Sequence, residues 1–190
     1  MRAIIANAAG GPEVLTIQET DAPAPGAGEV LVRTAAVGVN FIETYQRSGL
    51  YRVPFPFTPG AEASGTVIAV GEGVTGLDVG SLVATAEGRA SYAEQFVVPA
   101  AAAVQVPSGI TAEVAAALPL QGLTAHYLAT SAARPESGET VLVHAGAGGV
   151  GLLLTQLLTA RGVRVLTTVS TPEKRALSLA AGAVEALDYA

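Results

Sequence analysis

Hydrophobic and polar positions follow two different patterns along this chain, and the change between them divides it into two parts. Before residue 120, short stretches of alternating apolar and polar residues recur between clusters of glycine and proline. This pattern is typical of strands joined by tight turns, and it predicts a compact, barrel-like β domain. The expected strands are Arg2–Ala6, Val14–Glu19, Glu29–Val39, Ala63–Val70, Ser81–Thr85, Ser91–Pro99 and Ala103–Gln105.

After residue 120 the apolar segments become longer and alternate between strand-like and helix-like patterns. The expected order is a strand over Thr140–Ala145, a helix over Gly149–Ala160, a strand over Val163–Val169, a helix over Pro172–Ala181 and a strand over Val184–Leu187. Gly162 and Gly182 follow the two helices, as is common at helix ends. Strands that alternate with helices form a parallel sheet, so the pattern predicts half of a doubly wound α/β sheet.

A helical connector lies between the two patterns. One helix is expected over Thr111–Leu118 and a second over Thr124–Ser131. We therefore predict a β-rich domain over residues 1–120 and an α/β domain over residues 121–190.

A glycine cluster lies where the first strand of the second part turns into its helix. Gly146, Gly148 and Gly151 satisfy G-x-G-x-x-G, which allows a sharp turn, close approach of a pyrophosphate and close packing of helix on strand. The N–H groups at the start of a helix and the helix dipole favour negative charge. The motif alone is weak in a glycine-rich chain, but its position between strand and helix predicts a dinucleotide site.

The strand after the glycine cluster indicates which dinucleotide is bound. Sites for NAD carry an Asp or Glu about 20 residues past the glycines, where it accepts hydrogen bonds from the ribose 2′-OH. This strand instead ends in Thr167–Ser170, and Lys174 and Arg175 follow in the next helix. Hydroxyls and positive charge suit a 2′-phosphate, so the pattern favours NADPH. The alternative is that Lys174, the only lysine, lies on an ordinary solvated helix face.

Composition and charge exclude several other classes of function. Half of the 190 residues are hydrophobic, yet no apolar stretch is long enough to span a membrane. The net charge of −6 and the lack of a basic block argue against nucleic acid or an anionic membrane as a partner. With no cysteine and two histidines, disulfides, thiolate metal sites, a cysteine nucleophile and a histidine-rich metal site are excluded. We expect a soluble, cytoplasmic protein.

Four further motifs precede the glycine cluster. They are Gly38–Tyr45, Arg47–Tyr51, Pro59–Gly65 and Leu120–Ala125. Their order resembles the medium-chain dehydrogenase/reductase superfamily, and most closely its zinc-independent quinone oxidoreductases related to zeta-crystallin. The resemblance covers essentially the whole chain. It implies a GroES-like catalytic domain followed by a Rossmann domain, with the substrate in the cleft between them.

The same resemblance implies chemistry without a metal. Where the zinc alcohol dehydrogenases carry a cysteine and a histidine as ligands, this sequence has Asn40 and Ala61. Without zinc, activation of a carbonyl falls to hydrogen-bond donors or to the substrate itself. The implied reaction is hydride transfer from NADPH to a quinone or conjugated enone, which needs no metal. The alternatives are an enoyl or alkenal reductase on the same scaffold and a non-catalytic, crystallin-like NADPH-binding protein.

By resemblance, Asn40, Tyr45 and Tyr51 line the substrate pocket. Each has a structural alternative. Asn40 stands three residues before Glu43, an arrangement close to a capping box for a helix over Phe41–Gln46. The two tyrosines are alternatively half-buried core residues with their hydroxyls in water.

The expected cofactor residues come from three segments. The same resemblance implies that Thr124 contacts the nicotinamide end of the cofactor, that Gly148, Gly149, Val150 and Gly151 hold the pyrophosphate after the turn at Gly146, and that Ser170, Lys174 and Tyr189 hold the adenosine 2′-phosphate. Thr124 alternatively caps its own helix, and Tyr189 is alternatively a surface residue at a strand end. His126 and His144 are interpreted as packed structural residues, because neither has a sequence neighbour that suggests acid–base chemistry.

Relatives in this family continue beyond the position of Ala190, with strands that complete the sheet and a segment that completes the first domain. A sheet that ends after its third strand leaves Val141–Val143 as an exposed apolar edge, prone to aggregation. We therefore expect a fragment, or missing strands supplied by another chain. For the complete protein we expect a homodimer.

Overall fold

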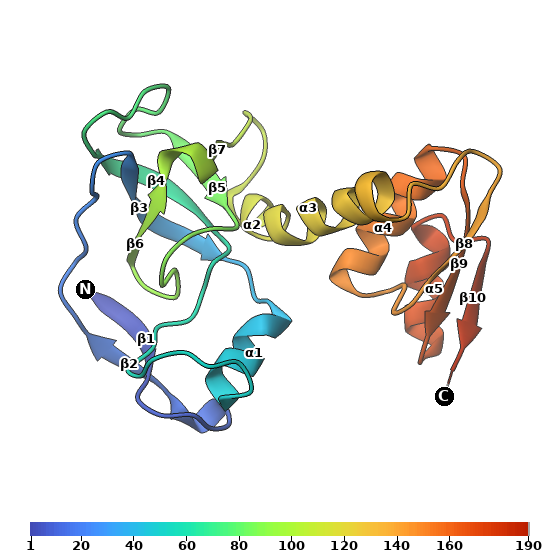
Figure 1. The fold of residues 1–190 in the computed structure, drawn as a ribbon, viewed down its shortest axis with the longest axis horizontal. Coiled ribbons are helices and arrows are strands. Elements are labelled where there is room, and N and C mark those ends of the chain that lie inside the picture. The colour runs from blue at the N-terminus through green and yellow to red at the C-terminus, as the bar shows by residue number, and fades with distance from the viewer. Residues whose placement is uncertain (190) are drawn as a thin grey trace. The chain divides into compact units, whose positions relative to one another are not determined.

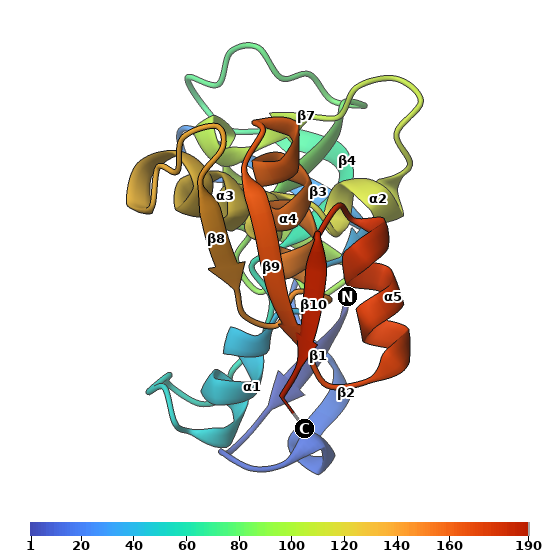
Figure 2. The same cartoon turned by 90° about the vertical axis from the view of Figure 1, so that its right-hand side faces the viewer.

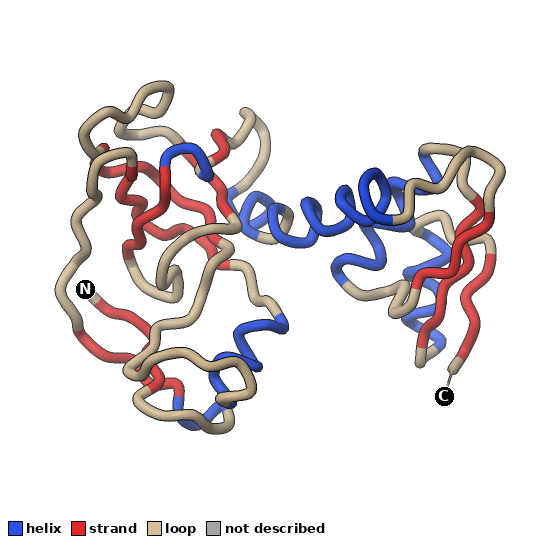
Figure 3. The backbone as a smooth tube through the Cα atoms, viewed as in Figure 1, coloured by secondary structure: helices blue, strands red, loops and turns tan. Residues whose placement is uncertain are grey.

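The computed structural model describes residues 1–189 and divides into two compact units. The first spans Met1–Pro119 and the second begins at Leu120 (Figure 1). The first consists mainly of strands and loops, and the second of strands and helices (Figure 3). The predicted order, a β-rich domain followed by a parallel α/β sheet, is confirmed.

The first unit holds a five-stranded antiparallel sheet and a separate hairpin. The sheet has the order β6-β3-β4-β5-β7, and the hairpin pairs β1 with β2. The strands are β1 Arg2–Ala6, β2 Leu15–Glu19, β3 Glu29–Val37, β4 Ala63–Val70, β5 Leu82–Thr85, β6 Gln95–Pro99 and β7 Val104–Gln105. Two register shifts between β3 and β4 mark irregular pairing, which is associated with bending and increased twist of a strand.

One hydrophobic core stabilises this sheet. Phe96 and the valines that point to the same face are almost completely buried. Its members are Val30, Val32, Ala63, Val67, Val83, Phe96, Val98 and Ala103. β-Branched side chains pack well on a pleated surface, which explains why these segments form strands.

Two strand predictions in this unit are too long by more than one residue. The expected strand over Ser91–Pro99 begins only at Gln95, because the residues before it bond to β1 instead. The Ile4 N–H donates to the Tyr92 carbonyl at 2.8 Å, and the Glu94 N–H donates to the Arg2 carbonyl at 3.0 Å. The expected strand over Glu29–Val39 ends at Val37, since Gly38 turns toward Glu62 and donates to its carbonyl.

The first unit also contains short helices, one between β3 and β4 and one after β7. Helix α1 spans Phe41–Ser48 and ends at Gly49, whose φ of 81° is the left-handed conformation common at helix ends. Helix α2 spans Ala112–Ala116 and is capped by the Thr111 side chain. Single 3-10 turns occupy Pro12–Val14 and Ala100–Ala102, so the strand expected from Val14 begins one residue later.

The second unit is a three-stranded parallel sheet in the order β10-β9-β8. Its strands are β8 Thr140–Val143, β9 Arg164–Val169 and β10 Glu185–Asp188, joined by helices α4 Gly149–Ala160 and α5 Pro172–Ala180. Figure 2 shows the three strands side by side, and Figure 1 shows both helices on one face of the sheet. Leu154 and Leu158, one turn apart on α4, pack with Val143 and Val165 in the core.

The helix expected over Thr124–Ser131 is different in the structure. Helix α3 spans Pro119–Tyr127 and continues into a π-helical segment over Leu128–Ala132. The helix starts earlier than predicted because proline is well tolerated in the first turn, and Gly122 lies inside it. Thr124 is therefore an interior residue of α3, and the hypothesis that it caps its own helix is wrong.

Strand β8 lies at one edge of the described sheet, as expected from the number of strands. Leu142 is half exposed, and a groove of about 390 Å³ runs along this strand, lined by Leu128, Pro135, Val141, Leu154 and Leu158 among others.

Among residues 1–189, no helix is both long and apolar enough to cross a bilayer.

Candidate functional site

The glycine loop leads from β8 into α4. The expected strand over Thr140–Ala145 ends at Val143, because Ala145 adopts a left-handed conformation with φ of 52°. Two backbone N–H groups of the loop donate to Thr168 in β9. The Gly146 N–H donates to the Thr168 carbonyl at 2.9 Å, and the Ala145 N–H donates to Thr168 Oγ1 at 3.3 Å. These bonds fix the loop that precedes the N-terminus of α4.

Two of the loop glycines are required by packing. A Cβ atom at Gly146 would overlap the Thr167 side chain, and one at Gly151 would overlap the Ala145 carbonyl oxygen. These are the positions where a dinucleotide motif needs a tight turn and close helix–strand packing. Glycine is therefore required at both positions by the fold of this unit.

The other two glycines have more space. A Cβ at Gly148 would lie 3.2 Å from the Ala145 carbonyl oxygen, and one at Gly149 would meet only the flexible end of Gln121, at 3.1 Å. Gly148 is the N-cap of α4 and has ordinary extended dihedrals, φ −77° and ψ 168°. The first N–H groups of a helix have no acceptor within it and suit an anion. The fold alone therefore demands glycine less strongly here, at the positions predicted to approach a pyrophosphate.

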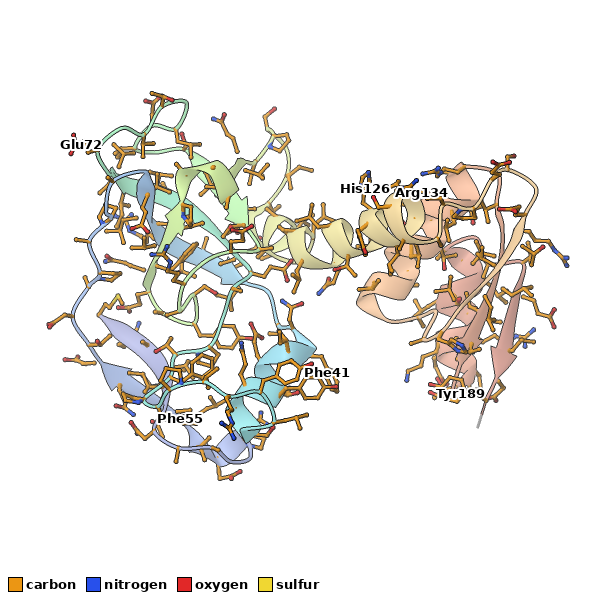
Figure 4. All side chains as sticks on the ribbon, in the orientation of Figure 1. Phe41, Phe55, Glu72, His126, Arg134 and Tyr189 are labelled. Carbon is orange, nitrogen blue, oxygen red and sulfur yellow. The ribbon has the colours of Figure 1, made fainter. Side chains whose placement is uncertain are left out.

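Predicted 2′-phosphate residues lie at the carboxyl ends of β9 and β10. Lys174 Nζ donates to Ser170 Oγ at 3.1 Å, and Thr171 caps α5 by accepting the Lys174 N–H at 3.3 Å. The Tyr189 N–H donates to the Val169 carbonyl at 3.2 Å, which ties the end of β10 to the end of β9. Figure 4 shows the exposed Tyr189 side chain at this end of β10. The structure thus brings Ser170, Lys174 and Tyr189 to one edge of the sheet.

Thr124 and the two histidines have local partners. The Thr124 hydroxyl donates to the Leu120 carbonyl at 2.7 Å, within α3. His144 Nδ1 lies 3.2 Å from Thr168 Oγ1, and His126 Nδ1 lies 3.5 Å from Thr130 Oγ1. His144 therefore contributes to the contact between the glycine loop and β9. Both histidines are exposed, however, so the interpretation of them as packed residues is wrong. The predicted contact of Thr124 with a cofactor stays a prediction.

Asn40 begins α1 with a capping box. Its backbone N–H donates to Glu43 Oε2 at 2.9 Å, as the spacing of the two residues predicts. Its side chain is engaged as well, because Asn40 Nδ2 donates to Glu62 Oε2 at 2.8 Å. The structural interpretation of Asn40 is thus confirmed. The predicted contact with a substrate stays a prediction.

The two tyrosines of the predicted substrate pocket lie together. The Tyr45 and Tyr51 ring centroids are 5.3 Å apart, and the Phe41 and Tyr45 rings meet edge to face at 5.4 Å. Phe41 is largely exposed on α1, as Figure 4 shows, and Tyr51 is half exposed. Three adjoining rings, two of them accessible, form an aromatic surface that suits a flat apolar molecule.

The sequence interpretation missed two residues beside Asn40. Glu62 is completely buried, and the Tyr92 hydroxyl donates to Glu43 Oε2 at 2.7 Å. Burial and the Glu43 carboxylate raise the pKa of Tyr92 above its usual range, so its hydroxyl remains a hydrogen-bond donor. A glutamate among small and apolar residues, as in Pro59–Gly65, was the available signal for Glu62. Nothing in the local sequence marks Tyr92.

Potential metal ligands are not clustered in the part of the chain that the structure describes. Over residues 1–189, no group of three or more histidine, aspartate or glutamate side chains could hold a metal ion. The candidate sites therefore consist of hydrogen-bonding groups, aromatic rings and backbone.

Comparisons with known proteins bear on both units. Residues 26–108 match the alcohol dehydrogenase GroES-like domain. The quinone oxidoreductase of Pseudomonas aeruginosa is 47% identical over 182 residues, which are 95% of this chain and 56% of that protein.

Solved structures agree closely with both units. Mycobacterial Rv1454c complexed with NADPH is 52% identical with a TM-score of 0.97, covering 100% of this chain and 59% of that one. Escherichia coli quinone oxidoreductase complexed with NADPH is 39% identical with a TM-score of 0.96, at the same coverage. The chain thus spans somewhat more than half the length of the proteins it matches.

Proposed function

We propose that the chain belongs to the quinone oxidoreductase family of medium-chain dehydrogenases/reductases, and that the whole protein reduces a quinone with NADPH. In this proposal the hydride acceptor is a quinone or a related conjugated carbonyl compound. The observation that carries the proposal is the glycine loop at the start of α4, with Ser170 and Lys174 at the same edge of the sheet. The names of the relatives favour a quinone over an enoyl thioester or a purely structural role.

The residues of the second unit fit NADPH. Gly148 and Gly149 leave space beside the first N–H groups of α4, where the pyrophosphate would bind. The Lys174 ammonium and the Ser170 hydroxyl would hold the 2′-phosphate, with Tyr189 beside them. As expected from the sequence, we also propose that Gly146, Val150 and Gly151 contribute to the pyrophosphate loop and that Thr124 contacts the nicotinamide end of the cofactor. When bound, NADPH supplies the hydride.

The residues of the first unit would orient the acceptor. Tyr45 and Tyr51 would pack against a flat quinone ring, and the Tyr51 hydroxyl would donate a hydrogen bond to the oxygen on which negative charge develops. Asn40 would provide an amide at the start of α1. Orientation and exclusion of water are the contributions expected of the protein when a cofactor carries the chemistry.

We propose that this chemistry needs no zinc. Asn40 and Ala61 occupy the positions where the zinc relatives have ligands, and neither side chain is a zinc ligand of the usual kind. A quinone is electrophilic enough to accept hydride with hydrogen bonds alone.

We also propose that the whole protein is a homodimer in the cytoplasm, which gel filtration and fractionation of the source cells would test.

The proposed function is tested by steady-state kinetics on the full-length protein. NADPH oxidation should depend on added quinone, and simple quinones should be better substrates than enals or enoyl thioesters. Faster turnover of enals or enoyl thioesters would indicate the alternative reductase. Binding of NADPH without turnover of any acceptor would indicate the non-catalytic role.

A further inference from the structure

Two carboxylates are buried around Asn40. Glu62 is completely buried and Glu43 is 7% exposed, and both lie within hydrogen-bonding distance of the same residue. The contacts of these two carboxylates include three neutral donors, the Asn40 amide, the Asn40 backbone N–H and the Tyr92 hydroxyl. Burying a carboxylate is costly unless it is hydrogen-bonded, so these contacts matter to the fold.

Asn40 is held from two directions. Glu43 Oε2 accepts its backbone N–H at 2.9 Å, and Glu62 Oε2 accepts from its side-chain Nδ2 at 2.8 Å. Glu62 Oε2 accepts from the Nδ2 end of the amide, and this bond fixes the orientation of the Asn40 side chain. The side chain of the proposed substrate residue is thus oriented before any acceptor binds.

Each carboxylate is in turn fixed. Tyr92 donates to Glu43 Oε2 at 2.7 Å, and its hydroxyl oxygen also lies 3.4 Å from the Gly38 carbonyl. Among the residues that the structure describes, Glu43 Oε1 is buried without a hydrogen-bond partner, so the Oε2 bonds are the ones that hold this carboxylate.

Glu62 is confined by backbone. A Cβ atom at Gly38 would overlap the Glu62 carboxylate and would lie 2.7 Å from the Ala116 carbonyl oxygen. The Gly38 N–H also donates to the Glu62 carbonyl at 2.9 Å. Only a residue without a side chain leaves room for this glutamate.

We propose that Tyr92, Glu43 and Glu62 are positioning residues for the reaction, which act through Asn40 by fixing its backbone and its amide. This inference rests on the proposed quinone reductase activity. It assigns a role to Tyr92, which is 52 residues away from Asn40 in the chain. A buried side-chain network of this kind fixes one geometry when its members are satisfied.

The test is a double-mutant cycle in the full-length protein, with Tyr92→Phe, Asn40→Ser and both together. Serine is also a good N-cap residue, so α1 should still form. Loss of the tyrosine hydroxyl should lower kcat/KM for the quinone about two- to tenfold, with the NADPH dissociation constant unchanged. Because Tyr92 acts through Asn40, the double variant should be no worse than Asn40→Ser alone.

Two comparisons separate positioning from a merely structural role. Tyr127→Phe, in α3 and exposed, is the matched control and should change neither kcat/KM nor stability. Glu62→Gln keeps an acceptor oxygen for Asn40 Nδ2, so it should retain more activity than Glu62→Ala when both are assayed well below their Tm.

Additive losses in the cycle, or full activity of Tyr92→Phe, would overturn the positioning role while the quinone reductase activity stands. An inactive wild type would instead overturn the proposed function, and this inference with it.

Discussion

At the scale of single residues, the most specific chemistry lies in side chains that the fold places beside one another. Lys174 reaches Ser170, and Tyr51 packs on Tyr45. In the sequence alone, Lys174 could equally lie on a solvated helix face, and the two tyrosines could equally be core residues. Three predictions follow from individual side chains.

Removal of the Lys174 ammonium should weaken NADPH binding selectively. A charge-assisted hydrogen bond contributes about 1.5–3 kcal/mol, so Lys174→Ala should raise the NADPH dissociation constant roughly ten- to a hundredfold. NADH lacks the 2′-phosphate and should bind both proteins equally. Fluorescence titration of the full-length protein measures both constants. Arg161→Ala, which removes an exposed cation elsewhere, is the control, and equal NADPH affinity of Lys174→Ala and wild type would remove Lys174 from the site.

Removal of the Tyr51 hydroxyl should slow the reaction. A donor aimed at developing charge is worth more than a neutral hydrogen bond in the ground state, so Tyr51→Phe should lower kcat roughly ten- to a hundredfold. The ring remains, and NADPH affinity and folding should be unchanged. Tyr45→Phe is the matched comparison, because the two rings touch. Full activity of both variants would show that the rings only shape the pocket.

Tyr92 should make stability sensitive to alkaline pH. Its raised pKa means that the folded protein holds the phenol proton more tightly than the unfolded chain does. The corresponding stabilisation is complete below about pH 10, the pKa of an unperturbed tyrosine, and is lost as pH rises through the folded value. Urea unfolding between pH 8 and 11 should therefore show a steeper loss in wild type than in Tyr92→Phe. Parallel curves for the two proteins would contradict this assignment.

At the scale of elements, the loop from β8 to α4 contains glycines required by packing and glycines proposed to bind the cofactor. Gly146 and Gly151 lack space for a side chain, whereas Gly148 has some. A motif in which every glycine looks alike in the sequence thus contains two kinds of position. Substitutions by alanine should distinguish them.

Gly151→Ala should destabilise the second unit by about 1–3 kcal/mol, because its Cβ would press on the Ala145 carbonyl. Gly148→Ala should cost less stability than Gly151→Ala, because its Cβ would lie 3.2 Å from the same carbonyl oxygen. It should nevertheless weaken NADPH binding roughly tenfold or more, since the new methyl group would lie where the pyrophosphate approaches. Urea unfolding and NADPH titration of the same samples measure the two effects. If Gly148→Ala binds NADPH as wild type does, the proposed pyrophosphate position is wrong.

At the scale of the whole molecule, the proposed activity needs both units. The residues proposed to contact the acceptor lie in the first unit, Met1–Pro119, and the glycine loop lies in the second unit, which begins at Leu120. Each unit has its own hydrophobic core, so each positions its own part of the chemistry.

Activity of the full-length protein should not require a metal. Cysteine is absent from the chain, and by the proposed resemblance Ala61 stands where the zinc alcohol dehydrogenases have a histidine. Exhaustive treatment with a chelator should leave quinone reduction unchanged, and elemental analysis of active protein should find no stoichiometric zinc. The decisive contrary result is loss of activity on chelation that added zinc restores.

Much of the fold was predictable because its signals are local. The order of strands and helices around the glycine loop follows from apolar periodicity, and the start of α1 at Asn40 follows from its capping box with Glu43. The errors in the strand bounds fell where distant backbone competes for hydrogen bonds. Residues before Gln95 pair with β1, and Ala145 bends toward β9.

The sequence by itself determined the order of strands and helices, the position of the glycine loop and the capping box of α1, because these depend on motifs of neighbouring residues. Only the tertiary structure decided which glycines are required by packing, that Ser170, Lys174 and Tyr189 share one edge, and that Glu62 and Tyr92 surround the start of α1. Glu62 and Tyr92 are 22 and 52 residues away from Asn40 in the chain. Contacts between such distant residues depend on how strands pair and pack, which no local pattern specifies.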